Sequence, residues 1–375
     1  MRGFPKIDPT QARGAAMALG AAVLFGVGAP YSKLLLEQVR PLTLAALLYI
    51  GAGLALLAIQ LLRRAFRVGS GAEAAVRIAD LPLLAAALLC GSILGPSLLM
   101  FGLDRVSAVT GSLLLNLEPP LTILIAVAWF REHLGGRQIG ATALILGGAA
   151  LVAYRPGEPV SQGLGILSVG LASLSWAVDT NLNQRLSLRD PVSLAAIKGL
   201  AGGAAMLAVA RFAGESWPGP RAIGGALVVG SVSYGVSMVL FFRGLRELGA
   251  ARVAAYFATA PFVGALASVA VLNERLRGAD LAAMGLMAAG LGLLLRETHD
   301  HEHVHEELEH DHAHAHDAHH EHDHPPGIAV ARRHAHPHRH APIVHAHPHV
   351  PDLHHRHRHD QEGKRRERPP VPGGG

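Results

Sequence analysis

The stretch that decides the fold is residues 111–132, which read GSLLLNLEPPLTILIAVAWFRE. It is an apolar segment of membrane-spanning length. Glu118, Pro119 and Pro120 lie near its middle, and the charged residue Glu132 closes it. Proline lacks the backbone N–H that continues a helix. The stretch therefore predicts a membrane span that is broken near its centre.

The same pattern returns later in the chain. Residues 251–274 are again apolar, carry Pro261 centrally and end at Glu274. Pro119 and Pro261 lie 142 positions apart (261 − 119), and the same step (274 − 132) joins Glu132 to Glu274. Two apolar segments with matching interruptions in the same register indicate an internally duplicated membrane protein.

Composition supports this class. Hydrophobic residues make up 50% of the 375 residues and charged residues only 16%. Long apolar runs in place of an amphipathic pattern predict a polytopic α-helical membrane protein. The net charge of +5 does not indicate a nucleic-acid partner, because Arg and Lys flank apolar segments and do not alternate with aromatic residues. The single Cys90 cannot form an intrachain disulfide.

Short polar breaks divide the chain into about ten spans. A signal peptide is an alternative for the first span, but further spans follow it at once. We predict a first five-helix repeat over 14–154, a second over 163–296, and a His-rich tail over 297–375. The spans are 14–36, 41–62, 81–103, 106–130, 136–154, 163–183, 191–212, 222–242, 251–272 and 278–295.

The Arg and Lys distribution predicts the orientation. One set of helix ends carries about twice as many of these residues as the other, which places both termini in the cytoplasm by the positive-inside rule. Because each repeat has an odd number of spans, the second repeat enters the membrane from the opposite side. Inverted repeats are typical of secondary transporters, with a substrate site near the midplane.

Several short motifs are informative: Leu24-Phe25-Gly26 in the first span, Leu117-Glu118-Pro119 in the fourth and Trp176-Ala177 in the sixth. Glu132 with Gly140 closes the first half, and Glu274 with Gly285 closes the second. They resemble the EamA family of the drug/metabolite transporter (DMT) superfamily. The resemblance implies a ten-helix inner-membrane carrier for small metabolites, amino acids or drugs. It also implies a central cavity lined mainly by the first four helices of each repeat. The second repeat has Ala260-Pro261 in place of the Glu-Pro motif, so any carboxylate chemistry there would be asymmetric.

Glu118 is the main candidate for chemistry. It lies near the bilayer centre, where an ionised carboxylate is costly unless it faces protein or water. One interpretation is a site for a proton or a substrate amine. The other is a packing role, in which the carboxylate bonds backbone groups freed by the prolines.

Asp179 and Lys198 lie at similar depth on neighbouring predicted spans, so we expect them to pair or to line a shared cavity. Lys198 could instead extend to the membrane surface. No catalytic constellation is recognisable in the spans, so we do not expect an enzyme. The residues expected to form the solute or coupling site are Glu118, Asn116, Asp179, Lys198, Trp176, Tyr234 and Tyr256, with helix breaks at Pro119, Pro120 and Pro261.

The tail has a different composition: 23 of the 24 histidines lie in it, and only His133 precedes it. Few apolar residues are available for a core, so we expect disorder. Neutral imidazoles suit Zn, Ni and Cu, and such binding would be lost below about pH 6. A tail without a biological role is the alternative. The predicted ligands are His299, His301, His303, His305, His310, His312, His314 and His316.

We therefore expect a secondary transporter in the cytoplasmic membrane that moves a small solute by alternating access. It requires no cofactor; its partners are membrane lipids, the solute and divalent metal ions, and not nucleic acid. One alternative is efflux of Ni, Co or Zn by way of the tail. Another is a membrane-anchored metal sensor or chaperone whose helices serve only as a scaffold. The sequence does not indicate the oligomeric state.

Overall fold

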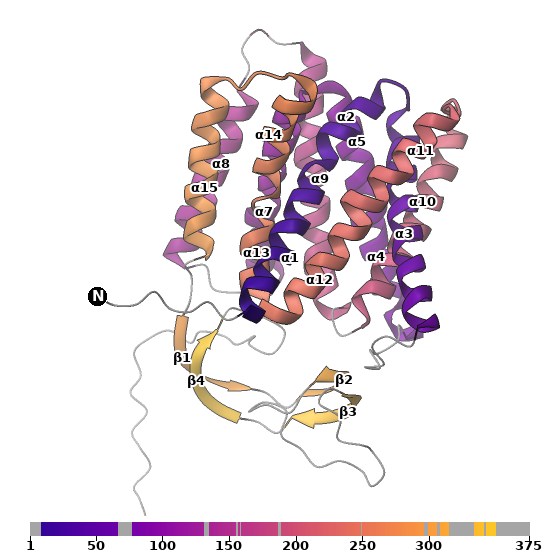
Figure 1. Ribbon diagram of the computed structural model, residues 1–375. Helices are drawn as coiled ribbons and strands as arrows, with labels where there is room; N and C mark the ends of the chain where they lie inside the picture. Colours follow the sequence, from indigo (N-terminus) through magenta and orange to yellow (C-terminus); the bar gives the residue numbers. More distant parts are fainter. Residues whose placement is uncertain are drawn as a thin grey trace, which may run out of the picture.

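The computed structural model is a bundle of long, roughly antiparallel helices with four short strands beyond one end of it (Figure 1). It describes residues 9–66, 77–130, 135–154, 157, 159–186, 189–248, 250–295, 299–305, 308–314, 334–340 and 343–349.

The first half contains five membrane segments, several of them built from more than one helical piece. The pieces are α1 (Pro9–Gly26), α2 (Gly28–Leu36), α3 (Pro41–Ala65), η1 (Ile78–Asp80), α4 (Leu81–Leu88), η2 (Leu89–Leu94), α5 (Gly95–Arg105), α6 (Ala108–Leu114), η3 (Leu115–Leu117), α7 (Glu118–Phe130) and α8 (Gly136–Ala153).

The second half repeats this order. Its pieces are α9 (Val160–Leu186), α10 (Pro191–Phe212), α11 (Pro220–Val229), η4 (Gly230–Val236), α12 (Ser237–Leu248), α13 (Ala250–Phe257), α14 (Ala260–Leu272) and α15 (Gly278–Leu295). Within the described residues, eight helical segments are long and apolar enough to cross a membrane, and two shorter apolar helices, α14 and α15, follow them. The prediction of an all-α polytopic membrane protein is confirmed.

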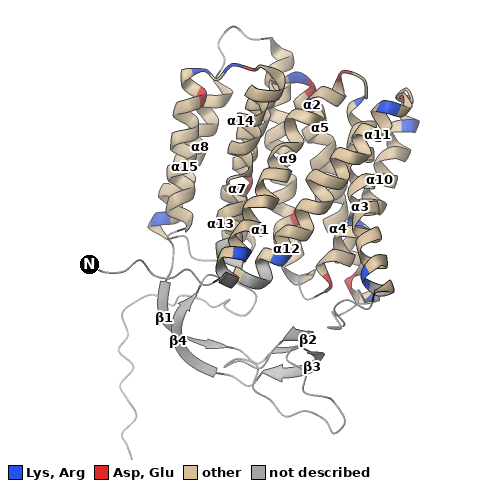
Figure 2. Ribbon diagram, viewed as in Figure 1, with Lys and Arg blue, Asp and Glu red and all other residues tan. Residues whose placement is uncertain are grey.

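The outside of the bundle is apolar in its middle and charged at its ends. Lys, Arg, Asp and Glu gather at the two ends of the helices, with few between them (Figure 2). Large apolar side chains such as Leu61, Val228 and Leu266 are exposed on helix surfaces. Exposing so many apolar side chains to water would be unfavourable, whereas contact with the lipid hydrocarbon is favourable.

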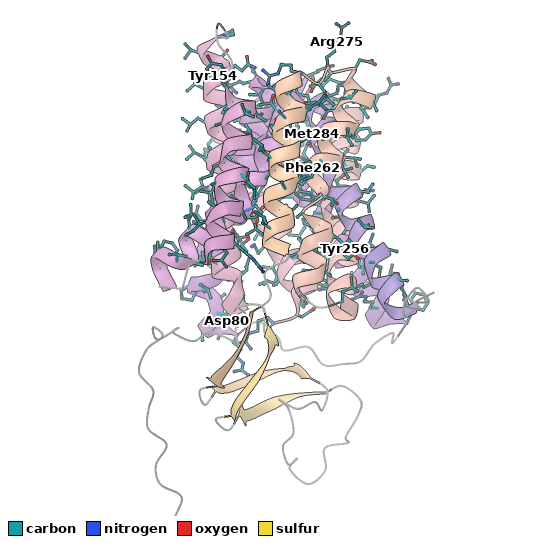
Figure 3. The ribbon with its side chains drawn as sticks, turned by 90° about the vertical axis from the view of Figure 1, so that its left-hand side faces the viewer. Asp80, Tyr154, Tyr256, Phe262, Arg275 and Met284 are labelled. Carbon is teal, nitrogen blue, oxygen red and sulfur yellow. The ribbon has the colours of Figure 1, made fainter. Side chains whose placement is uncertain are left out.

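The inverted repeat is visible in the packing of α8 against α15. Gly148 of α8 lies against Met287 and Ala283 of α15, and Gly290 of α15 lies against Ile145 and Ala141 of α8. Each contact becomes the other when 142 is added to the α8 residue number and subtracted from the α15 residue numbers. Tyr154 follows α8 and Arg275 precedes α15, and both lie at the same end of the bundle (Figure 3), so the two helices run in opposite directions.

The halves also meet where α3 packs against α10. Gly199 and Gly203 of α10 lie directly against the backbone of α3, near Gly53 and Ala46. Small residues allow two helix backbones to approach closely, which supports helix association within a membrane. Since α3 and α10 are the second helices of the two repeats, this contact joins equivalent elements.

Several membrane spans are interrupted within their length. The first is divided at Val27, between α1 and α2, and the ninth at Ala258 and Thr259, between α13 and α14. The fourth has a 3₁₀ turn, η3, before Glu118. The third and eighth contain the π-helical segments η2 and η4 at matching places. The predicted breaks at Pro119, Pro120 and Pro261 coincide with the starts of α7 and α14.

The tail differs from the expected absence of regular structure. Strands β1 (His299–His305) and β4 (Ile343–His349) pair in antiparallel fashion, as do β2 (Leu308–His314) and β3 (His334–His340). Composition suggested disorder because the segment lacks apolar residues. The alternation of His with other residues, however, has the two-residue period of a β-strand.

Candidate functional site

A small cavity lies where the interrupted helices of the two halves meet. Its volume is about 10 Å³, enough for about one water molecule. The lining comes from the α1–α2 break, α5, α6 with η3, η4 and the start of α14: Phe25, Gly26, Ala29, Leu99, Ser112, Leu115, Tyr234, Ala260 and Pro261. Both repeats therefore contribute to it.

Two of the residues that line this cavity, Phe25 and Tyr234, belong to a cluster of aromatic rings. The ring of Tyr234 meets that of Phe25 edge to face, with centroids 5.5 Å apart, and lies 6.0 Å from that of Tyr49. Phe25 in turn lies 5.2 Å from Phe257. These rings come from η4, α1, α3 and α13, so they join spans from both halves. Tyr234, one of the residues predicted for the solute site, thus lines this cavity.

Ser112 contributes a polar atom to the otherwise apolar lining. Its side chain is 1% exposed, and its hydroxyl oxygen has no hydrogen-bond partner within the described part of the chain. A buried hydroxyl without a partner is costly, so such groups usually meet water or a ligand. The hydroxyl is therefore available to a molecule in the cavity.

Asp179 and Lys198 form an ion pair between α9 and α10. The Lys198 ammonium nitrogen donates to both carboxylate oxygens, at 2.6 and 2.8 Å, and reaches the Asn183 amide oxygen at 3.4 Å. The side chains of Lys198 and Asp179 are only 12% and 13% exposed. The predicted pairing is confirmed, and the alternative in which Lys198 extends to the membrane surface is wrong.

The π-helical segment η2 packs against this ion pair. A methyl group at Gly91 would overlap the Asp179 carboxylate, so only glycine fits there. The Gly91 carbonyl accepts two hydrogen bonds, from the Tyr49 hydroxyl and from the Trp176 indole, each 3.0 Å long. Trp176 therefore orients a backbone group beside the ion pair, in addition to packing on Gly95.

Glu118 lies beside the same face of α9. Its carboxylate accepts a hydrogen bond from the Thr180 hydroxyl at 3.2 Å. Because Thr180 follows Asp179 in the chain, the carboxylate of α7 approaches the turn of α9 that carries the ion pair. The Glu118 backbone carbonyl, by contrast, accepts the Thr122 hydroxyl at 2.9 Å. The Glu118 carboxylate is thus held by a neutral hydroxyl donor, and it could give up this hydrogen bond for one to another group.

Two further residues predicted for the site, Asn116 and Tyr256, are not among those that line the cavity. Asn116 is buried in η3, where its amide donates to the Leu113 carbonyl at 3.2 Å and meets the Met287 sulfur at 3.6 Å. These bonds fasten the break in the fourth span to α15. Tyr256 is half-buried in the last turn of α13, where its carbonyl accepts the Thr259 hydroxyl at 2.6 Å. Their contacts indicate helix packing.

Glu274 caps a helix of the other repeat. Its carboxylate accepts the backbone N–H groups of Ala108 and Val109, at 2.7 and 2.8 Å, and so closes the N-terminus of α6. A carboxylate at a helix N-terminus is favourable, since it satisfies free donors and the helix dipole. The bond joins the second repeat to the broken span of the first. Its counterpart Glu132 lies outside the described residues.

Four groups near the ion pair were not found by sequence reasoning: the Gly91 carbonyl, Tyr49, Thr180 and Asn183. A backbone carbonyl carries no sequence signal, and a π-helical turn has no reliable motif. Lys33, which donates to the Leu103 carbonyl at the end of α5, was also missed. Its position near the end of a membrane span was the only available signal.

The expected metal ligands lie in the tail. His299, His301, His303 and His305 belong to β1, and His310, His312 and His314 to β2, whereas His316 lies outside the described residues. Among the residues whose side chains the structure describes, no group of three His, Cys, Asp or Glu could hold a metal ion.

Comparison with known proteins identifies relatives of the helical part. The sequence profile of the EamA-like transporter family matches residues 12–154 and again 163–296. An uncharacterized transporter of Methanothermobacter thermautotrophicus is 30% identical over 267 residues, which cover 68% of this chain and 78% of that protein. An uncharacterized protein of Pseudomonas aeruginosa is 29% identical over 204 residues, or 52% of this chain and 69% of its own length.

A solved crystal structure shares the fold. It is 19% identical, superposes with a TM-score of 0.53, and is matched over 75% of this chain and 96% of its own.

Proposed function

This chain belongs to the EamA-like transporter family, and from that premise we propose that it carries a small polar or amphiphilic solute by alternating access. The observation that carries the proposal is the convergence of interrupted helices from both repeats on one cavity near the middle of the bundle. Discontinuous helices leave backbone groups free for a solute, and inverted repeats place such a site near the midplane.

The cavity is too small for a solute, so transport requires the repeats to move apart around it. The reciprocal contact of α8 with α15 supports such a movement, because equivalent surfaces of the two repeats meet there. If the two repeats exchanged their conformations, equivalent residues of α8 and α15 would still make the same contacts. The site could then open to one side and afterwards to the other without losing the interface.

Closure at one end depends on bonds that can be broken. Glu274 holds the N-terminus of α6, and Lys33 holds the end of α5, both beside the connection between α5 and α6. Opening toward this end would separate α14 from α6 and release the Glu274 carboxylate to water. That exchange is nearly balanced, since the released groups form hydrogen bonds with water instead.

The ion pair and Glu118 would supply the chemistry of the site. A neutral pair of opposite charges can separate to bind a polar solute, whose own groups then replace the lost partner. Glu118 could take up a proton or a solute amine, because the donor that its carboxylate contacts among the described residues is the neutral Thr180 hydroxyl. Proton coupling would use this carboxylate, and solute binding would use Asp179 and Lys198.

The proposal includes a location and an orientation. We place the chain in the cytoplasmic membrane with both termini on the cytoplasmic side. The excess of Arg and Lys at the end of the bundle where α1 begins supports this orientation. In that arrangement Glu274 and Lys33 lie at the external end.

Solute flux into liposomes containing the purified protein tests the proposal. A thermal-shift screen of amino acids, purines and cationic dyes would first find a solute that stabilises the protein, and the radiolabelled solute would then be followed. We expect exchange flux in the native protein and its loss in Asp179→Asn.

The matched control is Asp104→Asn, which alters an exposed ion pair with Arg105 (3.2 Å) and should leave flux unchanged. Absence of flux for every stabilising solute would contradict a carrier and favour the scaffold hypothesis.

A further inference from the structure

The tail contains a feature that transport does not use: the register of its paired strands. In the pair of β1 and β4, His299 is opposite His349, His301 is opposite His347, and His303 is opposite His345. Each of these three pairs joins histidines more than forty positions apart in the chain, the shortest separation being that of His303 and His345 (345 − 303 = 42).

The second pair repeats the arrangement. In β2 and β3, the three opposed pairs are His310 with His338, His312 with His336, and His314 with His334. Successive residues of a strand fall on opposite faces, and directly opposed residues share a face. One face of each two-stranded ribbon therefore has histidine at seven of its eight positions. The exceptions are Ile343 in the first ribbon and Leu308 in the second.

We propose that each ribbon binds one divalent transition-metal ion, such as Zn²⁺ or Ni²⁺, through two neighbouring opposed pairs of histidines. Opposed positions in an antiparallel ladder have Cα atoms about 4.5–5.5 Å apart, and the next position on the same face is about 7 Å along the strand. Four histidine positions within that area match the four nitrogen ligands of a tetrahedral ion.

The register supplies what the local sequence lacks. A His-x-His run on one strand offers only two ligands on one face, whereas Zn²⁺ in a closed site takes four. The other two come from the partner strand, so the acidic segment around β1 and β2 and the basic segment around β3 and β4 each hold half of a site. Metal binding would therefore link the two parts of the tail.

The energetics favour metal-dependent pairing. An isolated two-stranded ribbon is at best marginally stable in water, and the other face of β1 offers little apolar area, with Asp300 and Glu302 beside Val304. An ion that binds the paired state and not the separate strands stabilises the pairing by mass action. Zn²⁺ is thus expected to act as the cross-link of each ribbon.

The test is a Zn²⁺ titration of the full-length chain in detergent, with a competing chelating indicator and a purification tag that contains no histidine. We expect two tightly bound ions per chain, one for each ribbon, and no competition from Mg²⁺, which prefers oxygen ligands. A chain that binds no Zn²⁺ tightly would overturn the proposal.

Two double variants separate register from composition. His345→Ala with His347→Ala removes the partners of His303 and His301 and should reduce the count of tight ions from two to one. His354→Ala with His355→Ala removes the same number of histidines from outside the four strands and should leave both ions bound. An equal loss in the two variants would mean that the tail binds metal by composition alone.

A further variant keeps both composition and local spacing. Val344→His with His345→Val, together with Ala346→His with His347→Ala, moves a His-x-His run by one position and so to the other face of β4. We expect one tight ion to be lost. Retention of both would overturn the register argument, and unchanged thermal unfolding of the helices would show that the substitutions act only in the tail.

Discussion

Removing either partner of the Asp179–Lys198 ion pair should destabilise the protein, and removing both should cost less than the sum of the two single losses. In Lys198→Met the ammonium group that lies 2.6 and 2.8 Å from the carboxylate oxygens is lost. The Asp179 carboxylate then remains in a site where its side chain is 13% exposed. Breaking a buried pair in this way costs about 3–5 kcal/mol.

The cost of protonating the isolated carboxylate sets an independent upper limit on this loss, and the limit has a similar size. The isolated carboxylate can avoid its charge by taking up a proton, which costs about 4 kcal/mol at pH 7 from its ordinary state in water. The loss of unfolding free energy in Lys198→Met should therefore not greatly exceed this figure. Asp179→Asn leaves a buried ammonium group and should be similarly unfavourable.

The double variant Asp179→Asn with Lys198→Met leaves no buried charge. Its loss should be smaller than the sum of the two single losses, with a coupling of about 1–3 kcal/mol. The assay is reversible unfolding in mixed detergent micelles, followed by circular dichroism, for all four members of the cycle. Additive effects, or single variants that lose less than about 1 kcal/mol, would refute the argument that the pair is buried and coupled.

Three further predictions concern the helices. Glu118→Gln should abolish flux driven by a pH gradient while leaving thermal unfolding near that of the native protein, because the Thr180 hydroxyl can still donate to the amide oxygen; equal flux of the two proteins between about pH 5.5 and 8 would contradict coupling at Glu118. Glu274→Ala should lower the unfolding free energy by about 1–2 kcal/mol through loss of the α6 cap, whereas Glu37→Ala on the exposed end of α2 should change it little; equal effects in the calorimeter would argue against the cap. Gly290→Ala places a Cβ 2.8 Å from the Ala141 carbonyl oxygen and should cost about 1–3 kcal/mol, while Gly292→Ala, with nothing within 4 Å of its Cβ, should be neutral or slightly stabilising; a reversed order in chemical denaturation would contradict the α8–α15 contact.

The sequence by itself determined the class, the duplication and the helix breaks. In the lipid hydrocarbon, an apolar run of membrane length must form its backbone hydrogen bonds within itself, as a helix does. The positions of the spans could therefore be predicted from the apolar runs. Proline cannot donate the hydrogen bond that continues a helix but is tolerated in the first turn. Pro119 and Pro261 therefore indicated the starts of α7 and α14. The pairing of Asp179 with Lys198 was also predictable, because two isolated charges at that depth would each be costly.

Tertiary structure alone decided which groups surround that pair and how the tail is arranged. The Gly91 carbonyl meets Tyr49 and Trp176 because a π-helical turn exposes it between α3 and α9, and turns of this kind have no residue signature. The tail's histidines were recognisable as metal ligands from composition. Their opposition across β1 and β4 depends instead on a register between distant segments. Local sequence specifies backbone geometry, but contacts between distant segments depend on how the whole chain packs.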